Sequence, residues 1–289
     1  MIRIIPLLVC LATATQTASR LADARAQIEQ LIGTSGAEVA VAARTLDGKD
    51  ELMIEPDKVF HAASTMKVAV MVELFNQVRA GKLRLDDPLT VKNQFHSIVD
   101  GSVYHLDMKS DSDEETYRLI GQAMTLEQLC DRMITVSSNL ATNLLIEKLG
   151  VDNIRRTVAA LGAEGLNILR GVEDSKAFEK GLNNTTTARG LLRLMESLAK
   201  GQAVDRKSSR RMVEILKRQK FNEAIPAGLP PGTPVAHKTG SITRIHHDAA
   251  IVYAKRPFVL VILVRGIEKE DVSAALMAKI TELVYQATQ

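Results

Sequence analysis

Ser64-Thr-Met-Lys67, preceded by Phe60-His-Ala-Ala, opens a stretch in which apolar residues recur at helical spacing as far as about Val78. In a helix that begins at Ser64, residues three positions apart lie on the same face. The Lys67 amine is then expected beside the Ser64 hydroxyl, where it can take the hydroxyl proton if its pKa is lowered. Free N–H groups at a helix N-terminus also favour a developing negative charge. Alone, the pattern is equally typical of a helix cap followed by a surface lysine.

Two further short motifs follow at long intervals. Ser137-Ser138-Asn139 interrupts an apolar helical stretch, which also happens at ordinary helix breaks. Lys238-Thr239-Gly240-Ser241 accompanies a predicted strand, where the small Gly240 lets a ligand approach the strand edge and leaves the Ser241 N–H free to bind it. Each motif is weak by itself, but an S-x-x-K, S-x-N and K-T-G set in this order is typical of penicillin-recognising serine enzymes.

With these motifs the chain resembles class A β-lactamases over nearly its whole length after residue 18. The resemblance implies hydrolysis of the β-lactam ring of a small-molecule substrate through an acyl-enzyme, without a metal or other cofactor. A D,D-peptidase or esterase, or a penicillin-binding protein that is acylated without turnover, is the alternative on the same fold. Flanking sequences that agree with the family are Thr125-Leu-x-x-Leu-Cys130, Asn143, Thr185-Thr-Thr187 and Leu229-Pro-Pro-Gly232.

The resemblance also implies roles for the catalytic residues. Ser64 is the nucleophile, Lys67 helps to activate it, and Ser137 carries a proton to the β-lactam nitrogen. Ser138 stands where the family usually has an Asp that is mostly structural, so the change leaves catalysis little affected. The residues implied in substrate binding are Asn139 for the side-chain amide, Lys238 and Thr239 for the carboxylate, the N–H groups of Ser64 and Ser241 for the oxyanion, and Tyr104 as an aromatic wall or a plain surface tyrosine.

The segment that carries the deacylating Glu departs from the family pattern of Arg, an aromatic, then Glu-x-x-Leu-Asn. Here Arg170-Gly-Val-Glu173 places the Glu three residues after the Arg instead of two. Glu179 begins a literal Glu-x-x-Leu-Asn but lies only six residues before Thr185. Glu173 is therefore the favoured base, and Glu179 is interpreted as an exposed loop carboxylate. Asn184 replaces the Asp that normally pairs with the Arg, which puts the ion pair that closes this loop in doubt.

A second departure concerns the Arg that binds the substrate carboxylate in the family. Aligning Ala249-Ala-Ile-Val252 with the apolar strand of the family puts His247 at that position, and Arg244 in the preceding turn is the alternative. Neighbouring residues of a strand point to opposite faces, so at most one of His246 and His247 faces the site. A metal site at this pair is disfavoured because no third ligand has a recognisable spacing. The acidic stretch 111–115 is interpreted as a solvated loop.

Composition sets outer limits on function. The 289 residues are 46% apolar, enough for a substantial core. A formal charge of +3 arises from 37 basic and 34 acidic residues that are scattered along the chain, which argues against nucleic-acid binding. Aromatics make up 3% and Trp is absent, which argues against a base-stacking or carbohydrate-binding surface.

The N-terminus is typical of a secretory signal. Arg3 precedes the apolar stretch 4–14, and small residues near Ala14 and Ala18 offer cleavage sites. We therefore expect a signal peptide at 1–18, a periplasmic or secreted protein, and no membrane association after cleavage. A buried N-terminal strand, or a lipid anchor at Cys10, is the alternative. Cleavage leaves Cys130 alone, so it is expected to be a buried free thiol.

Strand patterns cluster near both ends of the chain, at 37–45, 51–55, 234–240, 247–253 and 257–264, with helical patterns at 20–33 and 271–286. The region 85–215 between them is predicted to be mostly helical. The expected fold is α/β plus all-α: an antiparallel sheet flanked by helices, built from both termini, with an inserted helical lobe. The expected division is an α/β lobe at 19–62 and 216–289 and a helical lobe at 63–215, within one monomeric catalytic domain.

Overall fold

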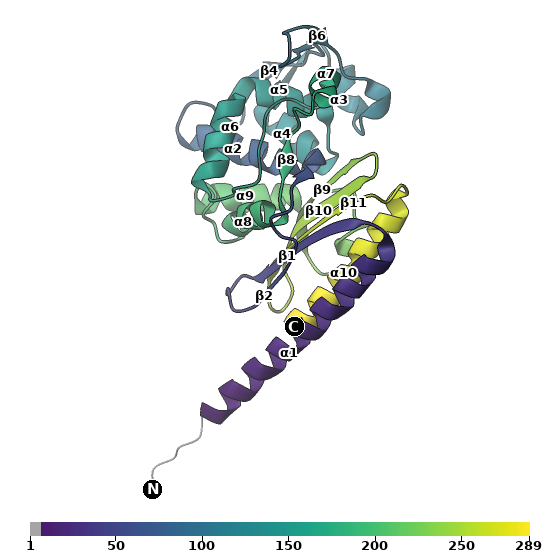
Figure 1. Ribbon diagram of the computed structural model, residues 1–289. Coiled ribbons are helices and arrows are strands. Elements are labelled where there is room, and N and C mark those ends of the chain that lie inside the picture. Colours follow the sequence, from purple (N-terminus) through teal and green to yellow (C-terminus); the bar gives the residue numbers. More distant parts are fainter. Residues whose placement is uncertain (1–6) are drawn as a thin grey trace.

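The computed structural model describes the chain from residue 7 to residue 289, and its side chains from residue 20 onwards. Five strands form one antiparallel sheet in the order β2-β1-β11-β10-β9. The two ends of the chain therefore build a common sheet, and the expected architecture is confirmed (Figure 1). The strands are β1 (Glu38–Thr45), β2 (Glu51–Ile54), β9 (Val235–Ile242), β10 (Ile245–Val252) and β11 (Phe258–Arg265).

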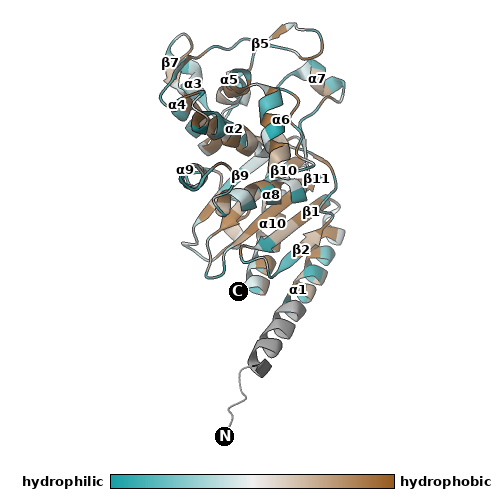
Figure 2. Ribbon diagram, turned by 90° about the vertical axis from the view of Figure 1, so that its left-hand side faces the viewer, coloured by the Kyte–Doolittle hydropathy of each residue, from teal (hydrophilic) through white to brown (hydrophobic). Residues whose placement is uncertain are grey.

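The central strand β11 is buried on both faces, which explains its continuous apolar sequence. On one face the helices α1 (Leu7–Ser35) and α10 (Glu270–Thr288) lie side by side (Figure 1). On the other face α8 (Ala188–Ala199) packs against β11, β1 and β10. Figure 2 shows the hydrophobic residues, in brown, along the strands that these helices cover.

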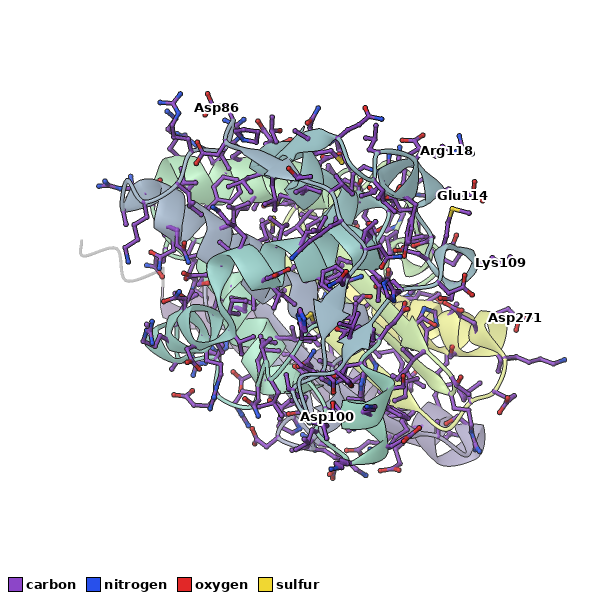
Figure 3. The ribbon with its side chains drawn as sticks, turned by 90° about the horizontal axis from the view of Figure 1, so that it is seen from above. Asp86, Asp100, Lys109, Glu114, Arg118 and Asp271 are labelled. Atoms are coloured by element: carbon purple, nitrogen blue, oxygen red, sulfur yellow. The ribbon has the colours of Figure 1, made fainter. Side chains whose placement is uncertain are left out.

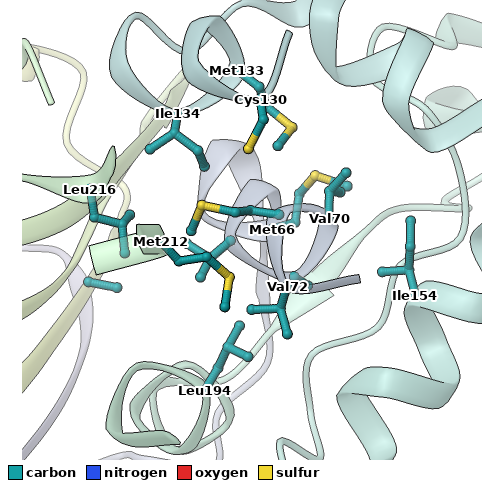
Figure 4. Close-up of a cluster of buried hydrophobic side chains, with 14 of the residues drawn as sticks. Met66, Val70, Val72, Cys130, Met133, Ile134, Ile154, Leu194, Met212 and Leu216 are labelled. Carbon is teal, nitrogen blue, oxygen red and sulfur yellow. The ribbon is translucent and has the colours of Figure 1, made fainter. Parts of the chain in front are cut away.

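Helix α2 (Lys67–Arg79) is the centre of the helical lobe. Every residue from Lys67 to Phe75 is buried, as expected for a helix surrounded by others. Figure 4 shows Val72 of this helix together with Cys130, Met133 and Met212 of its neighbours. The surrounding helices are α4 (Leu126–Thr135), α5 (Asn139–Leu149), α6 (Val151–Ala160) and α9 (Arg206–Leu216).

The prediction of a mostly helical segment is wrong for residues 85–125. This part forms short two-stranded ribbons, because turn residues such as Asp100-Gly101, with Gly101 at a φ of 72°, interrupt it every few positions. Its elements are β4 (Pro88–Thr90) paired with β7 (Ala123–Thr125), β5 (Phe95–His96) paired with β6 (Val103–Tyr104), the 3-10 turn η2 (Met108–Ser110) and the short helix α3 (Glu114–Arg118).

The described chain has four further short elements, besides the 3-10 turn Ala63–Met66. They are β3 (Phe60–His61), β8 (Thr185–Thr186), α7 (Ser175–Glu179) and the 3-10 turn η3 (Pro226–Gly228). Strand β3 pairs with β8 immediately before the first motif.

The predicted signal peptide falls partly outside the described residues. Residues 1–6 lie outside them, and residues 7–18 form the first part of α1, where side chains, including that of Cys10, are not described. Further along α1, Ala24 and Ile28 are buried in the same apolar cluster as Met277 of α10. Within the part of the chain that the structure describes, no helix combines the length and apolarity needed to cross a membrane.

Candidate active site

Ser64 lies on the 3-10 turn η1 (Ala63–Met66), directly before α2. The turn is strained, since Ala63 has a φ of 44°, in the left-handed region that disfavours residues with a side chain. Thr65 fixes the turn by donating its hydroxyl to the Ala62 carbonyl at 2.6 Å. Ser64 is half-buried there, at the N-terminal end of the helix, as the first motif predicts.

Strand β9 passes so close to η1 that glycine is required at position 240. A β-carbon on Gly240 would lie 2.8 Å from the Ser64 nitrogen and 2.9 Å from the Thr65 nitrogen. The glycine thus lets two backbones approach each other, the strand and the turn that carries Ser64. The two residues that flank it differ, because Thr239 is buried and Ser241 is exposed.

Lys67 is fully buried and its ammonium group points to the second motif. Nζ donates to the Ser137 carbonyl at 2.6 Å, to Asn139 Oδ1 at 2.7 Å and to Ser137 Oγ at 3.2 Å. A bond to Ser64 Oγ is not among these. The two residues therefore lie one turn apart, as predicted, but the Lys67 amine is not hydrogen-bonded to the Ser64 hydroxyl. Burial lowers the pKa of Lys67 to about 7, against the opposing charges of Asp111 and Glu173. The amine can therefore act as a base near neutral pH.

Ser137 lies between the two lysines of the motifs. Its backbone turns sharply at the end of α4, with a φ of 61°. Its Oγ accepts from Lys238 Nζ at 3.0 Å as well as from Lys67. Lys238 is also fully buried, and burial together with the charge of Lys67 lowers its pKa well below the usual range. Because both lone pairs of the hydroxyl are used, its proton is free to be given to a third group.

Asn139 connects Lys67 to Glu173. Its Oδ1 accepts from Lys67 Nζ, and its Nδ2 donates to Glu173 Oε1, both at 2.7 Å. Glu173 retains exposed surface, but desolvation of its carboxyl group, followed by the charge of Asp111, raises its pKa. The raised pKa makes this carboxylate a better proton acceptor near neutral pH.

Glu179 lies elsewhere, at the last position of the short helix α7. It is exposed, and in the described structure it forms no hydrogen bond or ion pair with another side chain. Of the two candidate carboxylates, in the described structure only Glu173 is linked to a lysine of the motifs, Lys67, by way of Asn139.

The segment that carries Glu173 closes without the Arg–Asp ion pair of the family. The Arg170 guanidinium is buried and donates to the Leu182 carbonyl at 2.8 Å and to Asn183 Oδ1 at 3.0 Å. Asn184 accepts the Leu169 and Arg170 N–H groups on Oδ1 and donates to the Arg170 carbonyl at 3.0 Å. Amide groups thus replace the ion pair, and the loop is closed.

Asn143 and Tyr104 hold the residue before Glu173. Asn143 accepts the Val172 N–H at 2.6 Å and donates to the Val172 carbonyl at 3.0 Å, which fixes the backbone in the manner of a strand partner. Tyr104 donates its hydroxyl to the same carbonyl at 3.2 Å, and burial raises its pKa to about 12. Tyr104 therefore supports the loop of Glu173, a function that the sequence did not suggest.

His247 is placed where it cannot offer a positive charge to a substrate. It is fully buried, its Nε2 donates to the His61 carbonyl at 3.0 Å, and its Nδ1 accepts the Val264 N–H at 3.1 Å. Burial lowers its pKa to about 4, so the ring is neutral. The expectation that His247 binds the substrate carboxylate is therefore not supported by this geometry.

The alternative residue, Arg244, is exposed in the turn between β9 and β10. Its Nη2 donates to the carbonyl of Gly266, beyond the end of β11, at 3.0 Å. His246 points to the opposite face from His247, as predicted, and bonds to the Ser273 hydroxyl of α10 at 2.8 Å. Neither histidine belongs to a cluster that could hold a metal, within the described residues.

Asp111 lies in a stretch whose interpretation as a solvated loop is partly wrong. The stretch 111–115 is not a solvated loop throughout, because Asp111 and Asp113 are buried while Glu114 is exposed. Figure 3 shows Lys109, Glu114 and Arg118 at the outer edge of the molecule. The spacing Asp113-x-x-Thr116 was a usable signal, since the Asp113 side chain caps α3 by accepting the Thr116 N–H.

Known proteins resemble this chain in sequence and in fold. The chain matches the family described as "Beta-lactamase enzyme family" over residues 23–288. A beta-lactamase of Bacillus licheniformis is 28% identical over 180 residues, which cover 60% of this chain and 58% of that protein. The chain spans between half and three fifths of the length of several such relatives.

Solved structures agree over a larger part of the chain. PBP-A superposes with a TM-score of 0.80 at 27% identity, covering 92% of this chain and 95% of that one. An ancestral class A β-lactamase gives a TM-score of 0.79 at 26% identity, covering 91% and 99%. The similarity thus extends to proteins of both kinds, one named for penicillin binding and one for β-lactam hydrolysis.

Proposed function

Because the chain belongs to the beta-lactamase enzyme family, we propose that it is a class A serine β-lactamase that opens the β-lactam ring through an acyl-enzyme on Ser64. The observation that carries the proposal is the hydrogen-bonded series in which Lys67 reaches the Ser137 hydroxyl and, through Asn139, the Glu173 carboxylate. These groups supply a base for each of the two half-reactions and a proton donor between them.

In the proposed acylation step, the neutral Lys67 amine takes the Ser64 proton while Ser64 Oγ forms a bond to the lactam carbonyl carbon. The N–H groups of Ser64 and Ser241 stabilise the oxyanion. The C–N bond then breaks, its electron pair stays on nitrogen, and that nitrogen takes the Ser137 proton. Lys67, whose Nζ lies 3.2 Å from Ser137 Oγ, replaces this proton and returns to the neutral amine.

In the proposed deacylation step, Glu173 takes a proton from a water molecule as the water oxygen bonds to the ester carbon. The bond from that carbon to Ser64 Oγ breaks, and the proton held by Glu173 is returned to Ser64 by way of Lys67. A positioned carboxylate of this kind contributes roughly 10²–10⁴-fold to the rate. The raised pKa of Glu173 strengthens it as a base.

Substrate binding is assigned to the remaining motif residues. We place the substrate side-chain amide on Asn139, and the carboxylate on Lys238 and Thr239. Arg244 joins them only in a rotamer that leaves the Gly266 carbonyl, and the neutral His247 is excluded from the proposal. We propose in addition that the enzyme acts as a monomer on a small-molecule substrate.

A D,D-peptidase or penicillin-binding activity is the second candidate, and the similarity to PBP-A favours it. Acylation would be the same in such a protein, whereas deacylation from β-lactams would be slow. This difference depends on Glu173, because Glu173 is the proposed base for deacylation. Its backbone has a φ of 61° in the loop that closes around Arg170.

Export is proposed from the sequence of residues 1–18. Their removal would leave a catalytic domain at 19–289, periplasmic or secreted, in which α1 keeps the residues that contact α10. Sequencing the N-terminus of protein recovered from periplasm and medium tests this proposal, and an intact residue 1 in both fractions would contradict it.

Steady-state assays test the main proposal. Purified protein should hydrolyse nitrocefin over many turnovers and leave a D-Ala-D-Ala peptide intact, and Ser64→Ala should abolish nitrocefin hydrolysis. Ser208→Ala, on α9 outside the site, is the matched control. A single stoichiometric burst of nitrocefin with peptide cleavage would favour the second candidate, and inertness toward both substrates would refute both.

A further inference from the structure

Asp111 lies outside all three motifs, yet its carboxylate is bound to the second of them. It is 8% exposed, and Oδ2 accepts the N–H groups of Asn139 at 2.9 Å and of Leu140 at 3.0 Å. Tyr117 donates its hydroxyl to the same oxygen at 3.1 Å. Ser138 Oγ accepts the next N–H of α5, that of Ala141, at 3.2 Å. Asp111 and Ser138 thus divide between them the free N–H groups that begin α5.

The residue that Asp111 holds by its backbone is the residue that joins Lys67 to Glu173 by its side chain. Asn139 accepts from Lys67 and donates to Glu173, both at 2.7 Å. A small movement of the Asn139 backbone would therefore change both contacts at once.

The segment around Asp111 is itself fixed. Asp113 is buried and forms an ion pair with Arg132 of α4. Ser112, between these two residues, donates its hydroxyl to the Val136 carbonyl, in the turn between α4 and α5, at 2.5 Å. Asp111 is consequently held against α5 by its own neighbours, as a rigid support requires.

Charge gives Asp111 a second effect on the site. The hydrogen-bond partners of the buried Lys67 ammonium are neutral oxygens of Ser137 and Asn139, so its counter-charge comes from Asp111 and Glu173. Lys238 of β9, which donates to the same Ser137 hydroxyl, carries a positive charge that acts on Lys67 in the opposite sense to these carboxylates. Asp111 Oδ1 is buried without a hydrogen-bond partner in the described structure, so no donor neutralises that side of the carboxylate.

We propose that Asp111 is a positioning residue for the reaction, which fixes the Asn139 backbone and supplies negative charge against which Lys67 is held. The inference rests on the proposed function for its consequence in catalysis, and on the contacts above for its effect on Lys67.

The test uses Asp111→Asn, which keeps an oxygen acceptor for the α5 N–H groups but removes the charge. Because Asp111 raises the pKa of Lys67, the variant should titrate Lys67 at lower pH, by at least about 0.5 unit. NMR of protein labelled at lysine Nζ, with Lys67→Met to assign the signal, measures this without any substrate. In the pH profile of the rate of Ser64 acylation by nitrocefin, the acidic limb should move to lower pH by the same amount.

Glu115→Gln is the matched control, since it removes an exposed carboxylate from the same segment. In this variant the Lys67 titration and the acidic limb of the acylation pH profile should stay at the wild-type values. Thermal melting establishes that both variants fold. An unmoved Lys67 titration in folded Asp111→Asn would overturn the inference, even if the acylation rate falls. If the wild type neither hydrolysed nitrocefin nor formed an adduct with it, the proposed function would instead be refuted, while the NMR titration still decides the inference.

Discussion

A β-carbon on Gly240 would lie 2.8 Å from the backbone nitrogen of Ser64, nearer than carbon and nitrogen approach without a bond. The spacing between β9 and η1 is therefore set by the absence of a side chain. The two N–H groups proposed for the oxyanion belong to Ser64 and to the residue after Gly240. Their separation is fixed by this one backbone contact.

We predict that Gly240→Ala slows acylation strongly while the protein still folds. The methyl group forces β9 and η1 apart, and a misplacement of about 1 Å can cost on the order of 10²-fold in rate. The measurement is the second-order rate of acylation by nitrocefin, with circular dichroism to check folding. Gly33→Ala, in a position of α1 with open space around it, is the control and should acylate normally. A wild-type rate for Gly240→Ala would refute the proposed arrangement.

Acylation should depend on pH through Lys67. Its lowered pKa of about 7 means that the neutral amine, the form that accepts the Ser64 proton, increases as pH rises through that value. The acylation rate should therefore rise between about pH 6 and 8. Lys67→Arg, which stays charged, should lose the reaction, whereas Lys92→Arg on the surface should not. A flat profile over this range would exclude Lys67 as the base.

The parts of the site that sequence predicts are those built from short contiguous motifs. Ser64 and Lys67 share one turn of chain, and the glycine beside Ser241 by itself signals a close approach of two backbones. Such motifs carry their geometry locally, in a helix start or a strand edge. The same holds for the strand patterns, which give the antiparallel sheet.

The surroundings of Asp111 and His247 could not be predicted from the sequence, for a physical reason. Buried charged or polar side chains depend on partners far along the chain, such as the Asn139 N–H for Asp111 and the His61 carbonyl for His247. Nothing in the local sequence reveals these partners. The local pattern therefore predicts a solvated loop for an acidic stretch, and a substrate ligand for a histidine beside a motif.

The neutral, buried His247 predicts a destabilisation in acid. Folding lowers its pKa from the unfolded value near 6.5 to about 4, so the unfolded chain binds the proton first. Stability from this group is complete above pH 6.5 and falls by roughly 2–4 kcal/mol as pH drops toward 4. Urea unfolding of His247→Gln over this range should give a shallower decline than the wild type. His96→Gln, an exposed position, should follow the wild type, and equal slopes for all three would contradict the assignment.

Cys130 should react only when the protein opens. The thiol is fully buried among the helices around α2, and burial raises its pKa, so little reactive thiolate forms (Figure 4). In a Cys10→Ser background, labelling by a thiol reagent should be slow in native protein and immediate in denaturant. Lys49→Cys, an exposed thiol in the same background, should label at once. Rapid labelling of native Cys130 would show that the core opens easily.

The last prediction separates the two carboxylates of the loop. Glu173 accepts a hydrogen bond from Asn139, while Glu179 stands exposed at the end of α7. Glu173→Gln, which keeps shape but cannot take a proton, should be acylated by benzylpenicillin at a normal rate.

Its adduct should then persist, because loss of a positioned base slows deacylation roughly 10²–10⁴-fold. Glu179→Gln is the matched change in the same loop and should turn over at the wild-type rate. Intact-protein mass spectrometry after mixing follows the adduct on both variants. An adduct that persists on Glu179→Gln but clears from Glu173→Gln would show that the other carboxylate is the base. If the adduct clears from both at the wild-type rate, deacylation uses neither of these two carboxylates.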